Sequence, residues 1–293
     1  MTAETRTAMP PVSEVAPAGS DFLADAITGL SSNQRTLPCK YFYDARGAAL
    51  FQKICELPEY YITRTEIDIL DRNRAEIASH LGPNIELIGL GTGAGTKTRI
   101  LIETLKDPAV YIPVDISEKQ LRESTALFQN IFPNMEILPV CADYLQPVRR
   151  VANVCRENGG LLIGADLKKD PLVLEAAYND RAGVTAQFNL NLLTRLNREL
   201  GADFDLESWR HCAVYNSDAG RIEMYLISEI DQFVHLDEQK FHFRTGEKII
   251  TEFSYKYAPE EFARLAGKAG FRFVRMWTDN ARLFGVFYFV AAS

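Results

Sequence analysis

The sequence is poor in the residues that build metal centres and disulfide frameworks. Only five of its 293 residues are cysteines, and these are scattered, odd in number and without a Cys-x-x-Cys pair. This excludes a disulfide scaffold and favours small buried thiols in a reducing cytosol. The four histidines fit no metal-ligand spacing, and we interpret all of them as surface or loop residues. We therefore expect a cytoplasmic protein without a metal.

Long apolar runs and an excess of positive charge are also missing. No hydrophobic stretch reaches membrane-spanning length and no signal peptide precedes the core, which argues against a membrane partner. The formal net charge is −7, whereas nucleic-acid-binding enzymes are more often basic. With 47% hydrophobic residues the chain can bury a large core. We expect a monomer that acts on a small molecule and not on nucleic acid.

The most informative segment present is a glycine-rich turn between two apolar runs. The first run stops at Gly91, the turn continues through Gly93 and Gly95, and a helical segment begins near Thr96. A second apolar run ends in one acidic residue, Asp115. This order is typical of a βαβ unit whose glycines let the backbone approach a nucleotide and whose carboxylate binds ribose hydroxyls. The later glycine that packs a helix against a pyrophosphate is missing, which favours S-adenosylmethionine.

Hydrophobic periodicity predicts an α/β protein. Helical patterns alternate with apolar runs that predict the strands of a parallel sheet: 85–90, 111–115, 135–141 and 161–166. The runs 271–278 and 283–291 are expected to close the sheet as an antiparallel hairpin. Thr63 and Glu66 are predicted to form a capping box at the start of a helix.

The element order divides the chain into two lobes and a tail. We predict a Rossmann-like class I methyltransferase core formed by residues 76–171 and 257–293. A second, discontinuous substrate-binding lobe would combine residues 21–75 with 172–256. Residues 1–20 are rich in Ala, Pro, Thr and Ser without an apolar period, which predicts a disordered tail.

The connection between Asp143 and Leu161 is shorter than this fold requires. Only 17 residues lie between them, and the stretch 145–158 has the pattern of a single helix. A further βαβ step needs more than ~30 residues. The sequence therefore predicts that one interior strand of the sheet is missing.

A series of separated motifs, in one order, carries a resemblance to a known family. The motifs include Leu37–Asp44, Leu57–Glu66, Gly91-x-Gly93, Cys141–Tyr144, Ala177–Asp180, Gly183–Ala186, Arg221–Met224, Thr251–Lys256 and Trp277–Asp279. In them the chain resembles the histidine Nα-methyltransferases of ergothioneine biosynthesis, which use S-adenosylmethionine to trimethylate the α-amino group of L-histidine to hercynine. Two departures stand out: Gly89 replaces a glutamate usual in the family, and a Gly-Ser-Thr-Ile-Gly-Asn strand segment is missing from the short connection.

The resemblance implies a set of cofactor-binding residues. Gly91, Lys97, Asp115, Asp143 and Tyr144 would surround S-adenosylmethionine. Asp115 would take the ribose hydroxyls, and Asp143 with Tyr144 would take the adenine. Methyl transfer from a sulfonium needs no metal, only an unprotonated amine held in line with the methyl carbon and away from water.

The resemblance also implies a substrate site. Glu252 and Ser254 are two residues apart and so share one face of a strand, where a carboxylate and a hydroxyl can bond both nitrogens of an imidazole. Met224 would line the imidazole pocket. The remaining site residues are tyrosines: Tyr60 and Tyr178 for the amino acid's carboxylate and amine, and Tyr43 as the catalytic candidate that orients the amine.

Two other functions stay open at this point. The missing segment normally supplies a substrate-holding Asn, so the chain could instead be an inactive or impaired family member that keeps the fold. A methyltransferase for another amine is a further alternative, against which Glu252 with Ser254 argues.

Overall fold

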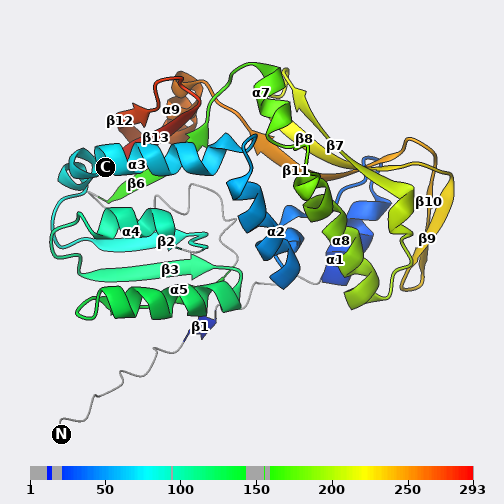
Figure 1. Cartoon of the computed structure of the whole chain (residues 1–293), viewed down its shortest axis with the longest axis horizontal. Helices are drawn as coiled ribbons and strands as arrows, with labels where there is room; N and C mark the ends of the chain where they lie inside the picture. The colour runs from blue at the N-terminus through cyan, green and yellow to red at the C-terminus, as the bar shows by residue number, and fades with distance from the viewer. Residues whose placement is uncertain (1–11, 15–21, 94, 143–154, 156–158, 293) are drawn as a thin grey trace, which may run out of the picture.

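The computed structural model describes residues 12–14, 22–93, 95–142, 155 and 159–292. The described part has two lobes side by side (Figure 1). One lobe contains a parallel sheet with flanking helices, and the glycine turn connects a strand of this sheet to a helix. The other is a long antiparallel sheet covered by helices, and it contacts the first along one flank.

The glycine turn belongs to a small parallel sheet. Its strand order is β1 (Ser13–Glu14), β5 (Val140–Cys141), β3 (Val110–Asp115) and β2 (Glu86–Leu90), and β4 (Glu136–Ile137) also pairs with β3. Helices α4 (Thr96–Ile102) and α5 (Glu118–Ile131) flank these strands (Figure 1). The strand predicted over 135–141 is two short strands, because Pro139 between them has no N–H to donate.

A second sheet in the same lobe is antiparallel. It has the order β12 (Phe271–Thr278), β13 (Phe284–Ala291) and β6 (Gly160–Asp166). The predicted antiparallel hairpin is confirmed, but among the described residues it does not close the parallel sheet, and the strand predicted over 161–166 belongs to this second sheet instead. Helices α3 (Tyr61–Leu81) and α9 (Pro259–Lys268) pack against it. Phe287 and Phe289 of β13 are fully buried.

The parallel and antiparallel sheets do not join. Among the described residues, β2 pairs only with β3, and β6 pairs only with β13. This is the separation expected if the strand between 85–90 and 161–166 is missing. Ile88 and Leu90 of β2 are 42% and 46% exposed, unusually open for a strand at the centre of a Rossmann-like core.

The second lobe is built on the antiparallel sheet β11 (Lys248–Tyr255), β8 (Arg221–Ser228) and β7 (Trp209–Asn216), with the hairpin β9 (Gln232–Leu236) and β10 (Gln239–Phe243) at its far end (Figure 1). Its helices are α1 (Phe22–Ser31), α2 (Ala45–Glu56), α7 (Pro171–Ala176) and α8 (Val184–Leu200), with 3-10 turns at Cys39–Phe42 and Leu206–Ser208. Leu192, Leu193 and Leu196 of α8 are fully buried in its core.

Three expectations differ from the structure. The capping box is wrong: α3 begins at Tyr61, so Thr63 lies inside the helix and bonds the Cys55 sulfur. Strand β7 was not predicted. Helix α3 also crosses the expected lobe boundary at residue 75, since Ile69 already packs in the core of the glycine-turn lobe.

The predicted tail lies mostly outside the described residues. Within it, Ser13 and Glu14 pair in parallel with Val140 and Cys141. No disulfide joins the five cysteines, all of which lie in the described part.

Candidate active site

The glycine turn has the backbone that only glycine adopts freely. Gly91, Gly93 and Gly95 have φ angles of 62°, 50° and 76°, in the left-handed region. The Gly91 N–H donates to the carbonyl of Val114 at 2.8 Å, which ties the turn to the end of β3. A Cβ placed on Gly93 would meet nothing within 4 Å. At Gly93, therefore, no other described residue covers the backbone, whose close approach a nucleoside site uses.

Asp115 closes this turn from the end of β3. Its side chain is only 6% exposed, and its two carboxylate oxygens accept the N–H groups of Gly93 and Ser117, each at 2.9 Å. Each oxygen keeps a second lone pair. The sequence correctly placed Gly91 directly after the first strand and Asp115 at the end of the second.

The other residues predicted to bind the cofactor are Lys97, Asp143 and Tyr144, and only Lys97 lies among the described residues. The Lys97 ammonium forms an ion pair with Glu66 of α3 at 2.9 Å. At Gly89, a Cβ would lie 2.7 Å from Thr92 and 3.2 Å from the Tyr111 ring. Asp143 and Tyr144 lie outside the described residues.

The predicted substrate residues come together around one pocket. All six border it: Tyr43, Tyr60, Tyr178, Met224, Glu252 and Ser254. The remaining lining residues are apolar except for one threonine: Phe51, Ile54, Ile62, Ala177, Thr185 and Phe188. Elements far apart in the sequence supply them, from the turn after Phe42 to β11. Glu252 stands opposite Met224 in the β11–β8 register.

Aromatic rings form one wall of the pocket. The rings of Tyr60 and Tyr178 meet edge to face with centroids 6.1 Å apart, and Phe51 meets Tyr60 in the same way at 6.2 Å. Phe188 packs against Phe51 and Tyr43. Such a wall is rigid and excludes water from whatever is bound.

Two titratable groups border the pocket, the Tyr60 hydroxyl and the Glu252 carboxylate, and no hydrogen bond joins either of them to another described residue. Burial raises the pKa of the Tyr60 hydroxyl well above its ordinary value. Burial also raises the pKa of the Glu252 carboxyl, and the charge of Lys256 opposes that shift. Because buried polar groups are nearly always hydrogen-bonded, these two point to a polar ligand.

Sequence reasoning missed several residues that support the pocket. Lys256, Asp166, Tyr61 and Lys169 form a buried network beside Tyr178 and Ser254. The signal available was Lys256, a lysine two residues beyond Ser254 on the same face of the strand.

His211 is the clearest correction, since it is not a surface histidine. It lies in β7, where its Nδ1 accepts from the Asn189 amide and its Nε2–H donates to the backbone carbonyl of Tyr178, both at 2.8 Å. Burial lowers the pKa of its imidazole, so the neutral ring holds Tyr178 from behind.

The described residues contain no group of three or more His, Cys, Asp or Glu side chains that could hold a metal. Of the helices in the described ranges, none has both the length and the apolar content needed to cross a membrane.

The α/β fold, with a glycine turn directly after strand β2, is the Rossmann-like core of a class I methyltransferase. A model of the SAM-dependent, histidine-specific methyltransferase family matches residues 22–153 and 146–291. This chain belongs to that family.

Named relatives agree with this assignment. The chain is 37% identical to the histidine N-alpha-methyltransferase of Mycolicibacterium smegmatis and 35% identical to that of Mycobacterium tuberculosis, in both cases over 89% of this chain and 92% of the relative. It is 29% identical to ergothioneine biosynthesis protein 1 of Neurospora crassa, over 83% of this chain and 32% of that longer protein.

Two features of the comparisons bear on the predicted shortage of chain between Asp143 and Leu161. The two stretches matched by the family model overlap at 146–153, inside the short connection. The alignment with the Mycolicibacterium smegmatis protein spans 297 positions, whereas 89% of 293 residues is about 261, so about 36 positions have no residue in this chain. These positions, taken together over the whole alignment, are comparable in number to the roughly 30 residues of one βαβ unit.

Proposed function

We propose that this chain transfers methyl groups from S-adenosylmethionine to the α-amino nitrogen of L-histidine, three times, to give hercynine. The observation that carries the proposal is the pocket that Glu252 and Ser254, on one face of β11, border together with Tyr60 and Tyr178. An amino acid with a polar ring matches a pocket that combines these polar groups with aromatic walls.

Each side of the pocket has its own task. The Glu252 carboxylate accepts the imidazole N–H, and Ser254 binds the second ring nitrogen. Tyr60 and Tyr178 hold the carboxylate and amine, while Tyr43 orients the amine toward the methyl donor. Because a site built for polar groups leaves them unpaired with the wrong ligand, it rejects amino acids with apolar side chains.

The cofactor supplies an electrophilic methyl carbon on its sulfonium. Asp115 is proposed to bind the ribose hydroxyls through its remaining lone pairs, and Gly91 and Lys97 to border the same ligand. Asp143 and Tyr144 are proposed for the adenine. The aromatic wall keeps water from the amine during the transfer.

The test is incubation with S-adenosylmethionine and histidine, followed by mass spectrometry for the mono-, di- and trimethylated products. Glu252→Gln should raise the KM for histidine about 10–100-fold, because a hydrogen bond to a charged group contributes about 1.5–3 kcal/mol. Affinity for S-adenosylhomocysteine should stay within about twofold, since the carboxylate faces the imidazole.

The matched control is Glu229→Gln, an exposed glutamate of the same lobe whose partner is Arg210. It should leave both constants unchanged. If Glu252→Gln weakened histidine and cofactor equally, Glu252 would be a structural residue. The comparisons give no support to the inactive alternative, and a monomeric state and a cytoplasmic location remain predictions.

A further inference from the structure

A fully buried lysine stands directly behind the substrate pocket. The Lys256 side chain has no exposed surface, and its ammonium donates to three oxygens: Asp166 Oδ2 at 2.8 Å, Tyr178 Oη at 2.9 Å and Ser254 Oγ at 2.9 Å. All three N–H donors are thereby used. Two of the three acceptors are pocket residues.

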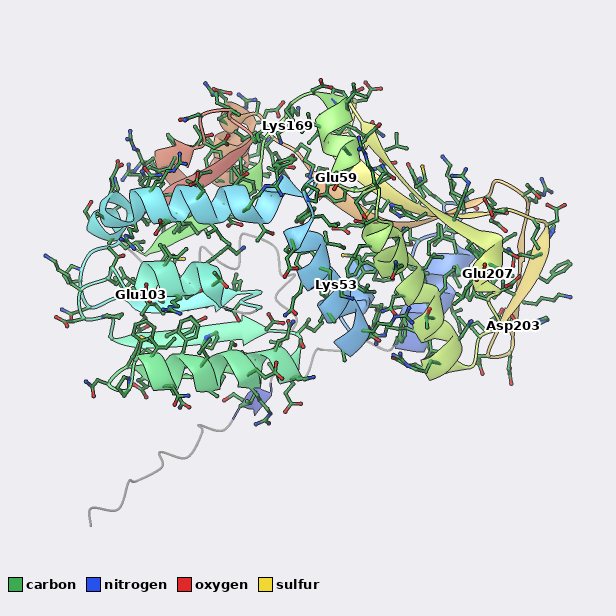
Figure 2. The ribbon with its side chains drawn as sticks, viewed as in Figure 1. Lys53, Glu59, Glu103, Lys169, Asp203 and Glu207 are labelled. Atoms are coloured by element: carbon green, nitrogen blue, oxygen red, sulfur yellow. The ribbon has the colours of Figure 1, made fainter. Side chains whose placement is uncertain are left out.

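The junction of the two lobes places Lys256 there. Beyond β11 the chain runs beside the end of β6, where the Tyr257 N–H donates to the Asp166 carbonyl and the Lys168 N–H to the Tyr257 carbonyl. Figure 2 shows Lys169 at the same junction. Asp166 also accepts from Tyr61 and Lys169, so the buried ammonium is held in a connected network.

The ammonium keeps its proton in this environment. Burial by itself lowers the pKa of Lys256, but the neighbouring Tyr178 and Asp166 more than offset burial and leave the pKa above its ordinary value. Lys256 therefore acts only as a donor toward Tyr178 and Ser254.

The Lys256 ammonium restricts where the hydroxyl protons of Tyr178 and Ser254 can point. Tyr178 Oη and Ser254 Oγ lie 2.7 Å apart, so one of their two protons lies between them. A phenol is more acidic than an aliphatic hydroxyl and is therefore the better donor, so we assign this proton to Tyr178. The Ser254 oxygen then accepts from both Tyr178 and Lys256. Its lone pairs are then occupied, and its own proton is directed to a third partner.

We propose that Lys256 is a positioning residue that makes Ser254 a hydrogen-bond donor toward the substrate. Beside Glu252, which accepts, the pocket then offers one acceptor and one donor. A neutral imidazole presents one N–H and one bare nitrogen, and so matches this pair. The inference rests on the proposed histidine methylation and specifies which form of the ring the site selects.

The test compares Lys256→Met with a matched control, Lys168→Met. Lys168 lies near the buried network but outside it. Its side chain is exposed and pairs with Glu261. Lys256→Met should raise the KM for histidine at least about tenfold, the effect of losing one charged hydrogen bond. Affinity for S-adenosylhomocysteine should stay within about twofold, and Lys168→Met should change neither. If Lys256→Met does not fold, Lys256→Gln is used in its place, because the glutamine amide keeps a hydrogen-bond donor.

A double-variant cycle separates positioning from general support. Because Lys256 acts through Ser254, the variant Lys256→Met/Ser254→Ala should lose little more histidine affinity than Ser254→Ala alone. Additive losses, equal losses of histidine and cofactor, or an unchanged KM would each overturn the inference. Failure of the parent protein to bind histidine would instead overturn the proposed function, and this inference with it.

Discussion

Replacing Asp115 by alanine distinguishes two possible roles of this residue: binding the cofactor and stabilising the glycine turn. The carboxylate accepts two backbone N–H groups at 2.9 Å and is 6% exposed. Hydrogen bonds to a charged group each contribute about 1.5–3 kcal/mol, but water can reach the freed N–H groups of an open turn. We therefore expect Asp115→Ala to lower the free energy of unfolding by about 2–4 kcal/mol.

The same substitution should also weaken cofactor binding. Loss of one charged hydrogen bond to a ribose hydroxyl predicts an affinity for S-adenosylhomocysteine about 10–150-fold lower. Titration calorimetry measures the affinity, and urea unfolding measures the stability of the same samples. Asp203→Ala is the control, because Asp203 also accepts two bonds, both from His235, in the other lobe. Reduced stability with unchanged affinity would show that Asp115 only shapes the turn.

Two further changes test the pocket's support and the split sheet. Burial lowers the pKa of His211, so the unfolded chain takes up its proton first; stability is complete above about pH 6.5 and falls below it, with a slope of up to about 1.4 kcal/mol per pH unit. Urea unfolding at pH 7.5 and 5.5 should show a smaller pH effect in His211→Asn than in the parent or in His235→Asn, and equal slopes in all three would refute this. Inserting a strand–helix segment of about 30 residues from a relative between Asp143 and Leu161 should raise both the unfolding temperature and the rate of histidine methylation, because β2 and β6 would regain a shared neighbour. Equal stability and equal rates would mean that the short connection is a complete variant.

Much of the candidate site followed from the order of residues. The turn at Gly91 and the acidic residue at the end of β3 are local signals, because strand, turn and helix are consecutive in the chain. Glu252 and Ser254 face the pocket together because side chains two apart share a strand face. Resemblance to a family added Tyr43, Tyr60 and Tyr178, which no local pattern distinguishes from ordinary core tyrosines.

The sequence by itself determined the glycine turn, the strand that carries Glu252 and the shortage of chain between Asp143 and Leu161, since all three depend only on neighbouring residues or on length. Tertiary structure alone decided the roles of Lys256 and His211. Lys256 bonds Tyr178 from 78 positions away, and His211 bonds it from 33 positions away. Hydrogen bonds of this range form only when strands from separate parts of the chain pack together. Burial lowers the pKa of His211, whereas the neighbours Tyr178 and Asp166 raise that of Lys256.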